Sequence, residues 1–290
     1  MKFGICPTPH PWWKSIKQLR DWIVEVERLG FDGVFMPDHH SMMKPMSDEV
    51  LDAWTTLSFF AAATSKLRLG TDVTPIPRWV PSQLAKVIAT VDVLSNGRVI
   101  AGFGAGSIPD EFVNYSPQGL EPPPVRVKRF SEGLQLILKL WTEEKTNFEG
   151  KYYKAKDAVL LPKPVQKPHP PIWSGGQGPL MLKITAKYFD GWVFPRLVPG
   201  MALPPELCES RIRIIRKHAK DYGRDLTNFT FGVLGSITDS AEVIEAYRQL
   251  GCQYYIVELF KGPGLSNPFP ADEYISASRK FAEEIIPSFT

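Results

Sequence analysis

The sequence predicts an α/β protein whose eight parallel strands close into a (β/α)8 barrel, the TIM-barrel fold, with an insertion between units four and five. Short apolar segments alternate with amphipathic helical segments eight times. The apolar segments lack polar alternation, as expected for parallel strands buried on both faces. The 290 residues also suit one such barrel, which typically uses about 250. A doubly wound open sheet is the rival fold.

The first half of the chain supplies four of the eight units. The expected strands are short apolar segments at residues 3–6, 33–36, 67–73 and 98–102. The expected helices repeat apolar residues at the i, i+3, i+4, i+7 spacing, at about 14–29, 53–64, 84–91 and 130–141. Gly30 follows the first helix as its stop signal.

The segment from about 142 to 170 interrupts this alternation and defines the insertion. Residues 148–153 indicate a small hairpin around Gly150. The alternation then resumes, with strands expected at 171–174, 191–194, 229–237 and 254–259, and helices at 180–187, 206–222, 241–250 and 272–285. Because no Pro/Gly/Ser-rich linker divides the chain, we expect residues 1–290 to form a single domain.

The composition excludes several classes of protein. Hydrophobic residues make up 43% and charged residues 22%, which argues against intrinsic disorder. A net charge of +3 gives no dense basic face for nucleic acid, and no run of about 18 apolar residues predicts a membrane span. The three cysteines form no CxxC pair, so neither a zinc ribbon nor a disulfide framework is expected. We therefore expect a cytoplasmic protein.

The loops that follow the strands are where a barrel carries its active site. Asp38, His39 and His40 follow the second strand and are the only acid–imidazole cluster in the sequence. A histidine held by a carboxylate exchanges protons near neutral pH, which favours a catalytic role for His39 with Asp38 as its partner. Loop polarity with a helix cap is one alternative. A metal site is another, but no HxH or HExxH spacing supports it.

Two glycine-rich loops suggest a bound ligand. Residues 102–106 follow the fourth strand but fail the dinucleotide fingerprint, because Ser107 stands where its third glycine would be. Residues 174–178 precede a helix, whose free N–H groups suit a phosphate. Together they favour an aromatic ligand with a phosphate tail, although each could also be a tight turn. The predicted mouth loops also contain Trp12, Trp13 and Trp79, as pocket walls or as core packing.

Four stretches of the sequence resemble the bacterial luciferase-like flavin and deazaflavin oxidoreductases. They are ERLGFDGVFMPDH (27–39), AATSKLRLGTDVTP (62–75), FEGKYY (148–153) and LPKPVQKPHPPIWSGG (161–176). The resemblance runs from about residue 2 to residue 259. It implies a (β/α)8 barrel that binds coenzyme F420 or FMN. The Asp38-His39 pair and the segment 69–75 favour the F420 branch.

The resemblance also implies roles for individual residues. A non-proline cis peptide between Asp72 and Val73 would form a bulge against the deazaflavin ring, with His39 near its reacting carbon. The loop from Gly104 to Ser107 would border the ring, and residues 174–177 would take the phosphate. The implied cofactor contacts are Thr71, Asp72, Val73, Gly104, Gly106, Ser107, Ser174, Gly175, Gly176 and Gln177.

These roles imply hydride transfer between F420 and a small alcohol, carbonyl or imine-like substrate, with a homodimer as the expected assembly. The sugar-phosphate dehydrogenases of the family carry a glutamate proton donor where this chain has Ser107, which argues against a sugar-phosphate substrate. Asp110 and Glu111 are interpreted as a helix N-terminal cap, and either could replace that glutamate only if the loop folds back. The alternatives are a two-component monooxygenase that uses reduced FMN, a flavin-binding protein without catalysis and, more distantly, a metal-dependent hydrolase.

Overall fold

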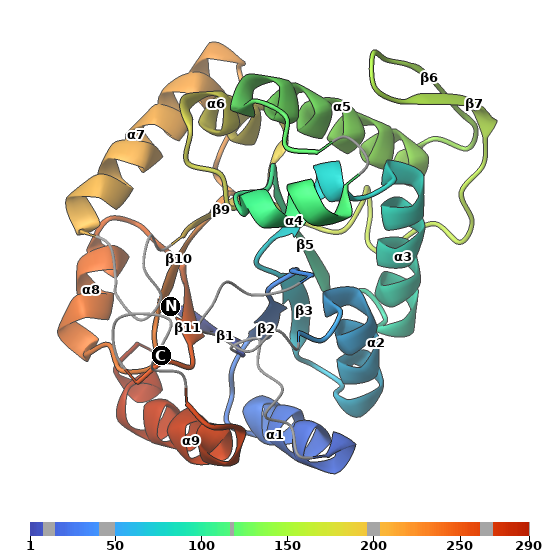
Figure 1. The fold of residues 1–290 in the computed structure, drawn as a ribbon. Helices are drawn as coiled ribbons and strands as arrows, with labels where there is room; N and C mark the ends of the chain where they lie inside the picture. Colours follow the sequence, from blue (N-terminus) through green and yellow to red (C-terminus); the bar gives the residue numbers. More distant parts are fainter. Residues whose placement is uncertain (8–14, 41–49, 117–118, 196–203, 262–268, 290) are drawn as a thin grey trace.

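The strands of the barrel form one closed parallel sheet (Figure 1). The computed structural model describes residues 1–7, 15–40, 50–116, 119–195, 204–261 and 269–289. Along the sheet the order is β3-β2-β1-β11-β10-β9-β8-β5-β4, and an additional pairing of β3 with β5 closes the ring. The predicted barrel is therefore confirmed, and the open doubly wound sheet is excluded.

The strands differ from their predicted bounds mainly at the third position. There the predicted strand 67–73 corresponds only to β3, which ends at Thr71, and β4 follows after Asp72 and Val73, beyond the predicted strand. The fourth strand continues two residues further than expected. The barrel strands are β1 (Lys2–Cys6), β2 (Gly33–Met36), β3 (Arg68–Thr71), β4 (Thr74–Pro75), β5 (Val99–Gly104), β8 (Ile172–Ser174), β9 (Gly191–Phe194), β10 (Thr230–Ser236) and β11 (Tyr254–Glu258).

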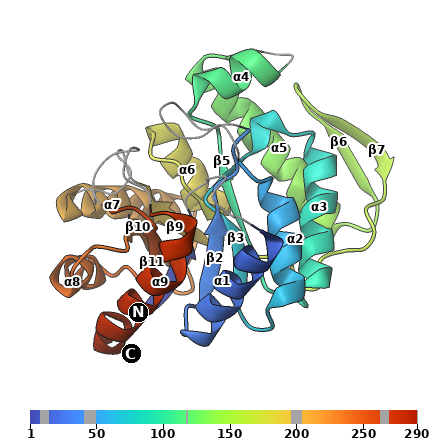
Figure 2. The same cartoon turned by 60° about the horizontal axis from the view of Figure 1, so that its bottom comes forward.

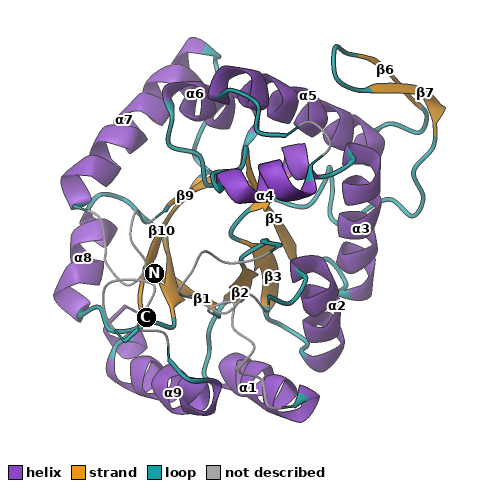
Figure 3. Ribbon diagram, in the orientation of Figure 1, coloured by secondary structure: helices purple, strands orange, loops and turns teal. Residues whose placement is uncertain are grey.

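The helices surround the strands as an outer layer (Figure 3). They are α1 (Ile16–Arg28), α2 (Ala53–Ala63), α3 (Pro81–Leu94), α4 (Pro109–Tyr115), α5 (Pro123–Thr142), α6 (Pro179–Tyr188), α7 (Pro205–Asp221), α8 (Ala241–Gln249) and α9 (Tyr274–Glu284), with short 3-10 turns η1 (Ile76–Arg78), η2 (Ala271–Glu273) and η3 (Ile286–Phe289). From α3 to α7, each helix begins with a proline, whose missing N–H costs nothing at that position. Five of the 27 prolines thus start described helices.

The insertion contains the predicted hairpin. Strands β6 (Thr146–Glu149) and β7 (Lys154–Ala158) pair antiparallel around the turn that contains Gly150. The hairpin projects from the side of the barrel beside α3 and α5 (Figure 2). A second addition, the short helix α4, is not among the eight predicted strand–helix units, and it lies over the rim of the barrel (Figure 1).

The interior of the barrel is filled by side chains rather than open. Phe35 on β2 stacks on Trp173 on β8, with ring centroids 5.5 Å apart, and the edge of Tyr254 on β11 packs against both rings. These aromatic residues belong to an inner cluster that is distinct from the larger core between sheet and helices. A packed interior leaves the carboxyl-terminal rim as the place for a ligand.

Candidate active site

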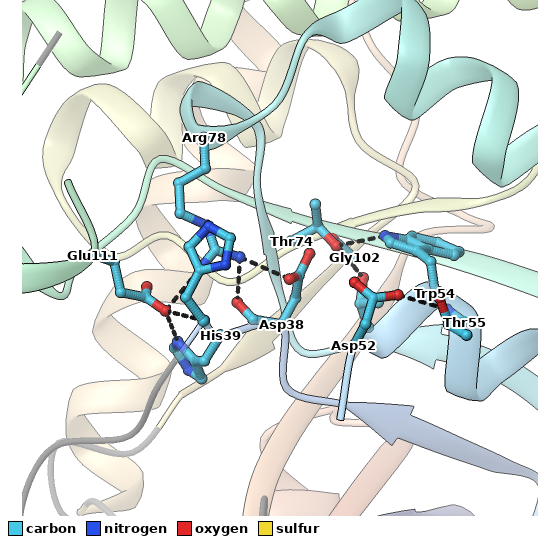
Figure 4. A network of polar contacts seen from close by, with 11 residues as sticks. Asp38, His39, Asp52, Trp54, Thr55, Thr74, Arg78, Gly102 and Glu111 are labelled. Carbon is cyan, nitrogen blue, oxygen red and sulfur yellow. Dashed lines mark hydrogen bonds and ion pairs between the residues drawn. The ribbon is translucent and has the colours of Figure 1, made fainter. Parts of the chain in front are cut away.

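Polar side chains from three neighbouring parts of the rim meet in one cluster (Figure 4). Asp38 and His39 follow β2, Arg78 ends η1 just after β4, and Glu111 lies in the first turn of α4. We call these four residues the rim cluster. The parallel strands bring them together because their carboxyl ends share one edge of the sheet.

Arg78 joins the two carboxylates of the rim cluster. Its Nη1 donates to Glu111 Oε1 at 2.7 Å, and its Nη2 donates to Asp38 Oδ1 at 2.7 Å and to the Asp38 carbonyl at 2.8 Å. The side chain of Arg78 is only 2% exposed. Bridging of this kind fixes the spacing between the two acids and offsets part of the cost of burying them.

Glu111, not Asp38, is the carboxylate that contacts the His39 ring. His39 Nδ1 lies 3.2 Å from Glu111 Oε1, and the His40 amide donates to the same oxygen at 2.7 Å. The side chain of His39 is 21% exposed, whereas that of Glu111 is 2% exposed. The predicted pairing of His39 with Asp38 is therefore wrong, because the Asp38 carboxylate faces Arg78.

The interpretation of Glu111 as a helix N-terminal cap is also wrong. Helix α4 has no side-chain cap, and the Glu111 carboxylate reaches back across the rim to the segment after β2. Asp110, its neighbour in the same turn, is exposed to solvent. Arg78 was missed altogether. The sequence does contain a signal for it, because Arg78 lies in the loop after the third barrel strand and the acidic Glu111 lies in the loop after the fourth.

The two carboxylates of the rim cluster have opposite protonation tendencies. Burial raises the pKa of Asp38 above its usual value, and the nearby Arg78 guanidinium and Thr74 hydroxyl only partly oppose this. Burial would also raise the pKa of Glu111, but the His39 ring, Arg78 and the His40 amide outweigh it and hold that pKa below its usual range. Glu111 therefore stays ionised to a lower pH than an ordinary glutamate, whereas Asp38 takes up a proton at a higher pH than an ordinary aspartate.

One oxygen of Asp38 remains without a partner. Asp38 is 4% exposed, and its Oδ2 is buried with no hydrogen-bond partner among the residues that the structure describes. Buried polar atoms are rarely left unsatisfied in native proteins. This acceptor at the rim is therefore a place where a donor group of a ligand fits.

The predicted bulge lies beside the rim cluster, between β3 and β4. The peptide bond between Asp72 and Val73 is cis, as the resemblance implied. A Cβ atom at Gly104 would lie 2.7 Å from Val73 Cγ2, and one at Gly175 would lie 3.1 Å from Val73 Cγ1. Gly104, at the end of β5, and Gly175, just after β8, therefore leave room for the Val73 side chain. The two predicted ligand loops meet at this side chain.

Thr71 supports the bulge from within the protein. It is 2% exposed, its hydroxyl donates to the Gly102 carbonyl at 2.8 Å, and it receives a hydrogen bond from Thr74 at 3.2 Å. Trp54 on α2 donates to Thr74 in turn, at 3.0 Å. The hydroxyl of Thr71 is thus engaged inside the protein, and its predicted contact with a cofactor stays a prediction.

The predicted phosphate loop is held by its own hydrogen bonds. Ser174 is fully buried, and its Oγ accepts from Thr185 Oγ1 at 2.8 Å and from the Gly176 amide at 3.3 Å. The Gly176 carbonyl accepts from Trp192 at 2.9 Å. Gln177 is partly exposed just before α6, whose first amides have no partner within the helix. The Gly175 amide also donates, to the Phe103 carbonyl at 3.3 Å, so the amides of both glycines are used within the protein and the Ser174 side chain points inward. The predicted contact of this loop with a phosphate stays a prediction.

Arg126 on α5 holds the loop after β5. Its Nε donates to the Ala105 carbonyl at 3.2 Å and its Nη2 to the Gly106 carbonyl at 3.3 Å. Gly106 has a φ of +83°, and a Cβ there would lie 2.3 Å from the Phe112 ring. Ser107 follows as an exposed residue. The predicted ring-bordering loop is thus fixed from behind, and its Ser107 side chain is accessible.

Some sequence predictions cannot be compared with the structure. Trp12 and Trp13 lie outside the described residues, whereas Trp79 is partly buried and packs against the main core. Within the described ranges, no group of three or more His, Cys, Asp or Glu side chains is arranged to hold a metal ion. No described helix is long and apolar enough to cross a membrane.

The family model for luciferase-like monooxygenases matches residues 1–284. The chain belongs to this family. Among solved structures, the monooxygenase RslO1 from Streptomyces bottropensis superimposes with a TM-score of 0.82 at 23% identity, covering 100% of both chains. An F420-dependent secondary alcohol dehydrogenase gives a TM-score of 0.81 at 19% identity, covering 100% of this chain and 99% of that chain. At these identities the likeness shows the shared luciferase-like fold.

Curated relatives match a part of the luciferase-like chain. An F420-dependent glucose-6-phosphate dehydrogenase from Microbacterium testaceum is 35% identical over 179 residues, which are 61% of this chain and 52% of that protein. An F420-dependent hydroxymycolic acid dehydrogenase from Mycobacterium tuberculosis is 30% identical over 208 residues, 66% of this chain and 55% of that protein. The matched part thus spans about half the length of these relatives.

Proposed function

We propose that this luciferase-like protein is an F420-dependent oxidoreductase that transfers a hydride between the deazaflavin and a small alcohol, carbonyl or imine-like substrate. The main observation behind the proposal is that two features share one rim of the barrel. One is the Val73 bulge after β3, and the other is the imidazole–carboxylate pair of His39, which follows the neighbouring strand β2, and Glu111. The relatives named F420-dependent dehydrogenases support the choice of cofactor.

The residues present suit a planar, hydrogen-bonding cofactor. Val73 with its glycine neighbours offers an apolar support, and the unpartnered Asp38 Oδ2 offers a buried acceptor to a donor group. We propose that the ring lies against Val73 and the loop from Gly104 to Ser107, and that residues 174–177 bind the phosphate. When bound, the deazaflavin would supply hydride transfer at its ring carbon.

His39 is the residue that we propose to move the proton. Oxidation of an alcohol to a carbonyl releases a hydride and a proton, so a base must stand beside the substrate hydroxyl. His39 is partly exposed at the rim, and Glu111 is placed to stabilise the imidazolium that forms. In the reverse direction the same ring would return the proton to the carbonyl oxygen.

We propose a substrate other than a sugar phosphate, although several relatives are named glucose-6-phosphate dehydrogenases. Ser107 cannot donate a proton as a glutamate would. Glu111 is a poor replacement for that glutamate as a proton donor, because its Oε1 accepts from His40 and Arg78 and contacts His39, and its pKa is held below its usual range. The predicted homodimer and cytoplasmic location stay predictions.

Anaerobic titration of the purified protein with F420 and, separately, with FMN tests the proposal. We expect tight binding of F420 and loss of its absorbance when a small secondary alcohol is added in the absence of oxygen. Tight binding of reduced FMN, with oxygen uptake in a separate aerobic assay, would instead support a two-component monooxygenase. Binding of F420 with no turnover on any alcohol, carbonyl or imine would support a binding protein without catalysis.

Replacement of His39 tests its role. His39→Ala should lower the rate about 100-fold, as expected for loss of an acid–base group. His218→Ala is the control, because His218 lies on α7 and pairs with Asp221, away from the rim cluster. An unchanged rate in His39→Ala would remove His39 from the mechanism.

A further inference from the structure

We infer that Glu111 is a positioning residue that holds His39 with its Nδ1 protonated and leaves Nε2 as the atom that exchanges the proton. The role of Nε2 in catalysis rests on the proposed function. The tautomer itself is a property of the protein alone, so it can be tested without cofactor or substrate.

The donors around Glu111 determine the direction of its bond to His39. Glu111 Oε1 accepts from the Arg78 guanidinium at 2.7 Å and from the His40 amide at 2.7 Å. Neither group can accept a hydrogen bond, and an arginine keeps its protons at any ordinary pH. These two fixed donors require an oxygen acceptor at this position.

Because Glu111 is ionised, His39 can only be the donor in the hydrogen bond between them. The pKa of Glu111 is held below its usual range by its His39, Arg78 and His40 contacts, despite its burial. An ionised carboxylate has no proton to donate, so His39 Nδ1, at 3.2 Å, must be the donor. A neutral imidazole carries one N–H. The lone pair therefore lies on Nε2, which has no hydrogen-bond partner among the described residues.

Arg78 keeps the other acid away from the ring. It binds Asp38 through both Oδ1 and the backbone carbonyl, and Glu111 through Oε1. Because the guanidinium is a rigid fork, the two carboxylates are held on separate nitrogens. Asp38, although adjacent in sequence, is therefore not free to turn towards His39.

The same contacts attach helix α4 to the segment after β2. Glu111 is the anchor from the side of α4, and the ring of Tyr115 at the end of that helix lies 4.8 Å from the ring of His40. The orientation of His39 and the seating of α4 on the rim are thus one structural feature, and a change at Glu111 should affect both.

Long-range ¹H–¹⁵N NMR of the protein without cofactor reads the tautomer directly. At a pH where His39 is neutral, we expect the wild type to show a protonated Nδ1 and an unprotonated Nε2. Glu111→Ala removes the acceptor, so His39 should revert towards the Nε2-protonated form that predominates in free histidine. A wild-type ring protonated on Nε2 would overturn the inference, whatever the variants do.

Two variants separate positioning from folding. Glu111→Gln keeps an amide oxygen where Arg78 and His40 require one, so the wild-type tautomer should survive in a folded protein. Asp110→Asn removes a charge from the same turn of α4 without touching the cluster, and should match the wild type. Retention of the wild-type tautomer in Glu111→Ala would contradict the role assigned to Glu111.

The kinetic test shows whether this positioning serves the reaction. Glu111→Ala should lower kcat/KM at least about tenfold, and Glu111→Gln should recover part of that loss while moving the pH profile. Asp110→Asn should leave both unchanged. If the tautomer behaves as expected but the wild type turns over no substrate, the proposed function fails and the positioning of His39 stands.

Discussion

Val73 occupies the space that small residues on two other strands leave open. Cβ atoms at Gly104 and Gly175 would lie 2.7 Å and 3.1 Å from its methyl groups. At Gly102 a Cβ would lie only 1.8 Å from the Thr71 carbonyl oxygen. These glycines therefore serve the packing of the bulge. The assignment of residues 102–106 to a flat ligand and of residues 174–178 to its phosphate stays a prediction.

Gly104→Ala should destabilise the protein through this contact. A methyl group 2.7 Å from Val73 Cγ2 forces either side chain to move, and overpacking of this kind costs about 1–3 kcal/mol. Urea unfolding measures the loss. Gly178→Ala is the control, since nothing lies within 4 Å of a Cβ there. When Val73→Ala is combined with Gly104→Ala, the loss of unfolding free energy should be smaller than the sum of the losses in the two single variants. Losses that simply add would refute the contact.

The position of the bulge could be predicted from sequence, but the pairing of the rim cluster could not. Segment 69–75 placed the cis bond between Asp72 and Val73 by resemblance, and the structure confirms it. The partner of His39 depends on how α4 returns across the rim, which brings Glu111 from 72 residues away. Sequence adjacency favoured Asp38, because nothing local reveals that Arg78 holds it.

At the scale of elements, the β6–β7 hairpin depends on one side chain of α5. Glu132 accepts hydrogen bonds from three successive amides of the turn, those of Lys151 at 3.1 Å, Tyr152 at 2.6 Å and Tyr153 at 2.7 Å. A two-stranded hairpin is marginally stable on its own. The carboxylate therefore anchors a projecting element to the body of the barrel.

Glu132→Ala should loosen the turn while leaving the barrel folded. Amide hydrogen exchange at 151–153 should accelerate at least about tenfold, because bonds to a charged acceptor are worth about 1.5–3 kcal/mol. Glu149→Ala is the control, since Glu149 is exposed on the hairpin and pairs only with Lys154. Equal exchange in the two variants would show that Glu132 does not hold the turn.

Element prediction succeeded where the hydrophobic pattern was long and failed where it was short. The long helices follow from periodicity, the strands follow from short apolar runs, and the hairpin follows from residues 148–153. Helix α4, with seven residues, is too short to show a period. The break between β3 and β4 was also missed, because it is set by the bulge at Asp72 and Val73 rather than by the hydrophobic pattern.

At the scale of the molecule, the barrel closes where the two ends of the chain meet. Strand β1 pairs with both β2 and β11, and Met1 donates to the Phe289 carbonyl at 2.9 Å. The eight-unit count predicted this closure, since an eighth parallel strand must lie beside the first. That residues 1–290 act as one domain stays a prediction. The outer layer closes in the same place, where α1 lies beside α9 (Figure 1).

Glu25 links these first and last helices and should make the closure pH-dependent. Its side chain binds Arg28 on α1 and Arg279 on α9, and these bonds lower the pKa of Glu25 from 4.5 to about 2. A lowered folded-state pKa stabilises the protein above the unfolded value of 4.5, and this contribution is lost as the pH falls towards 2.

Glu25→Gln should therefore lower the free energy of unfolding most at neutral pH. Both arginines are largely exposed, so we expect a loss of about 1 kcal/mol at pH 7 rather than the full value of the shift. Urea unfolding at about pH 7 and about pH 3.5 should show the difference from the wild type shrinking at the lower pH. Asp21→Asn, which breaks only the Lys17 pair within α1, should cost about 0.3–0.5 kcal/mol. If Glu25→Gln lowers the free energy of unfolding by the same amount at both pH values, packing rather than charge joins α1 to α9.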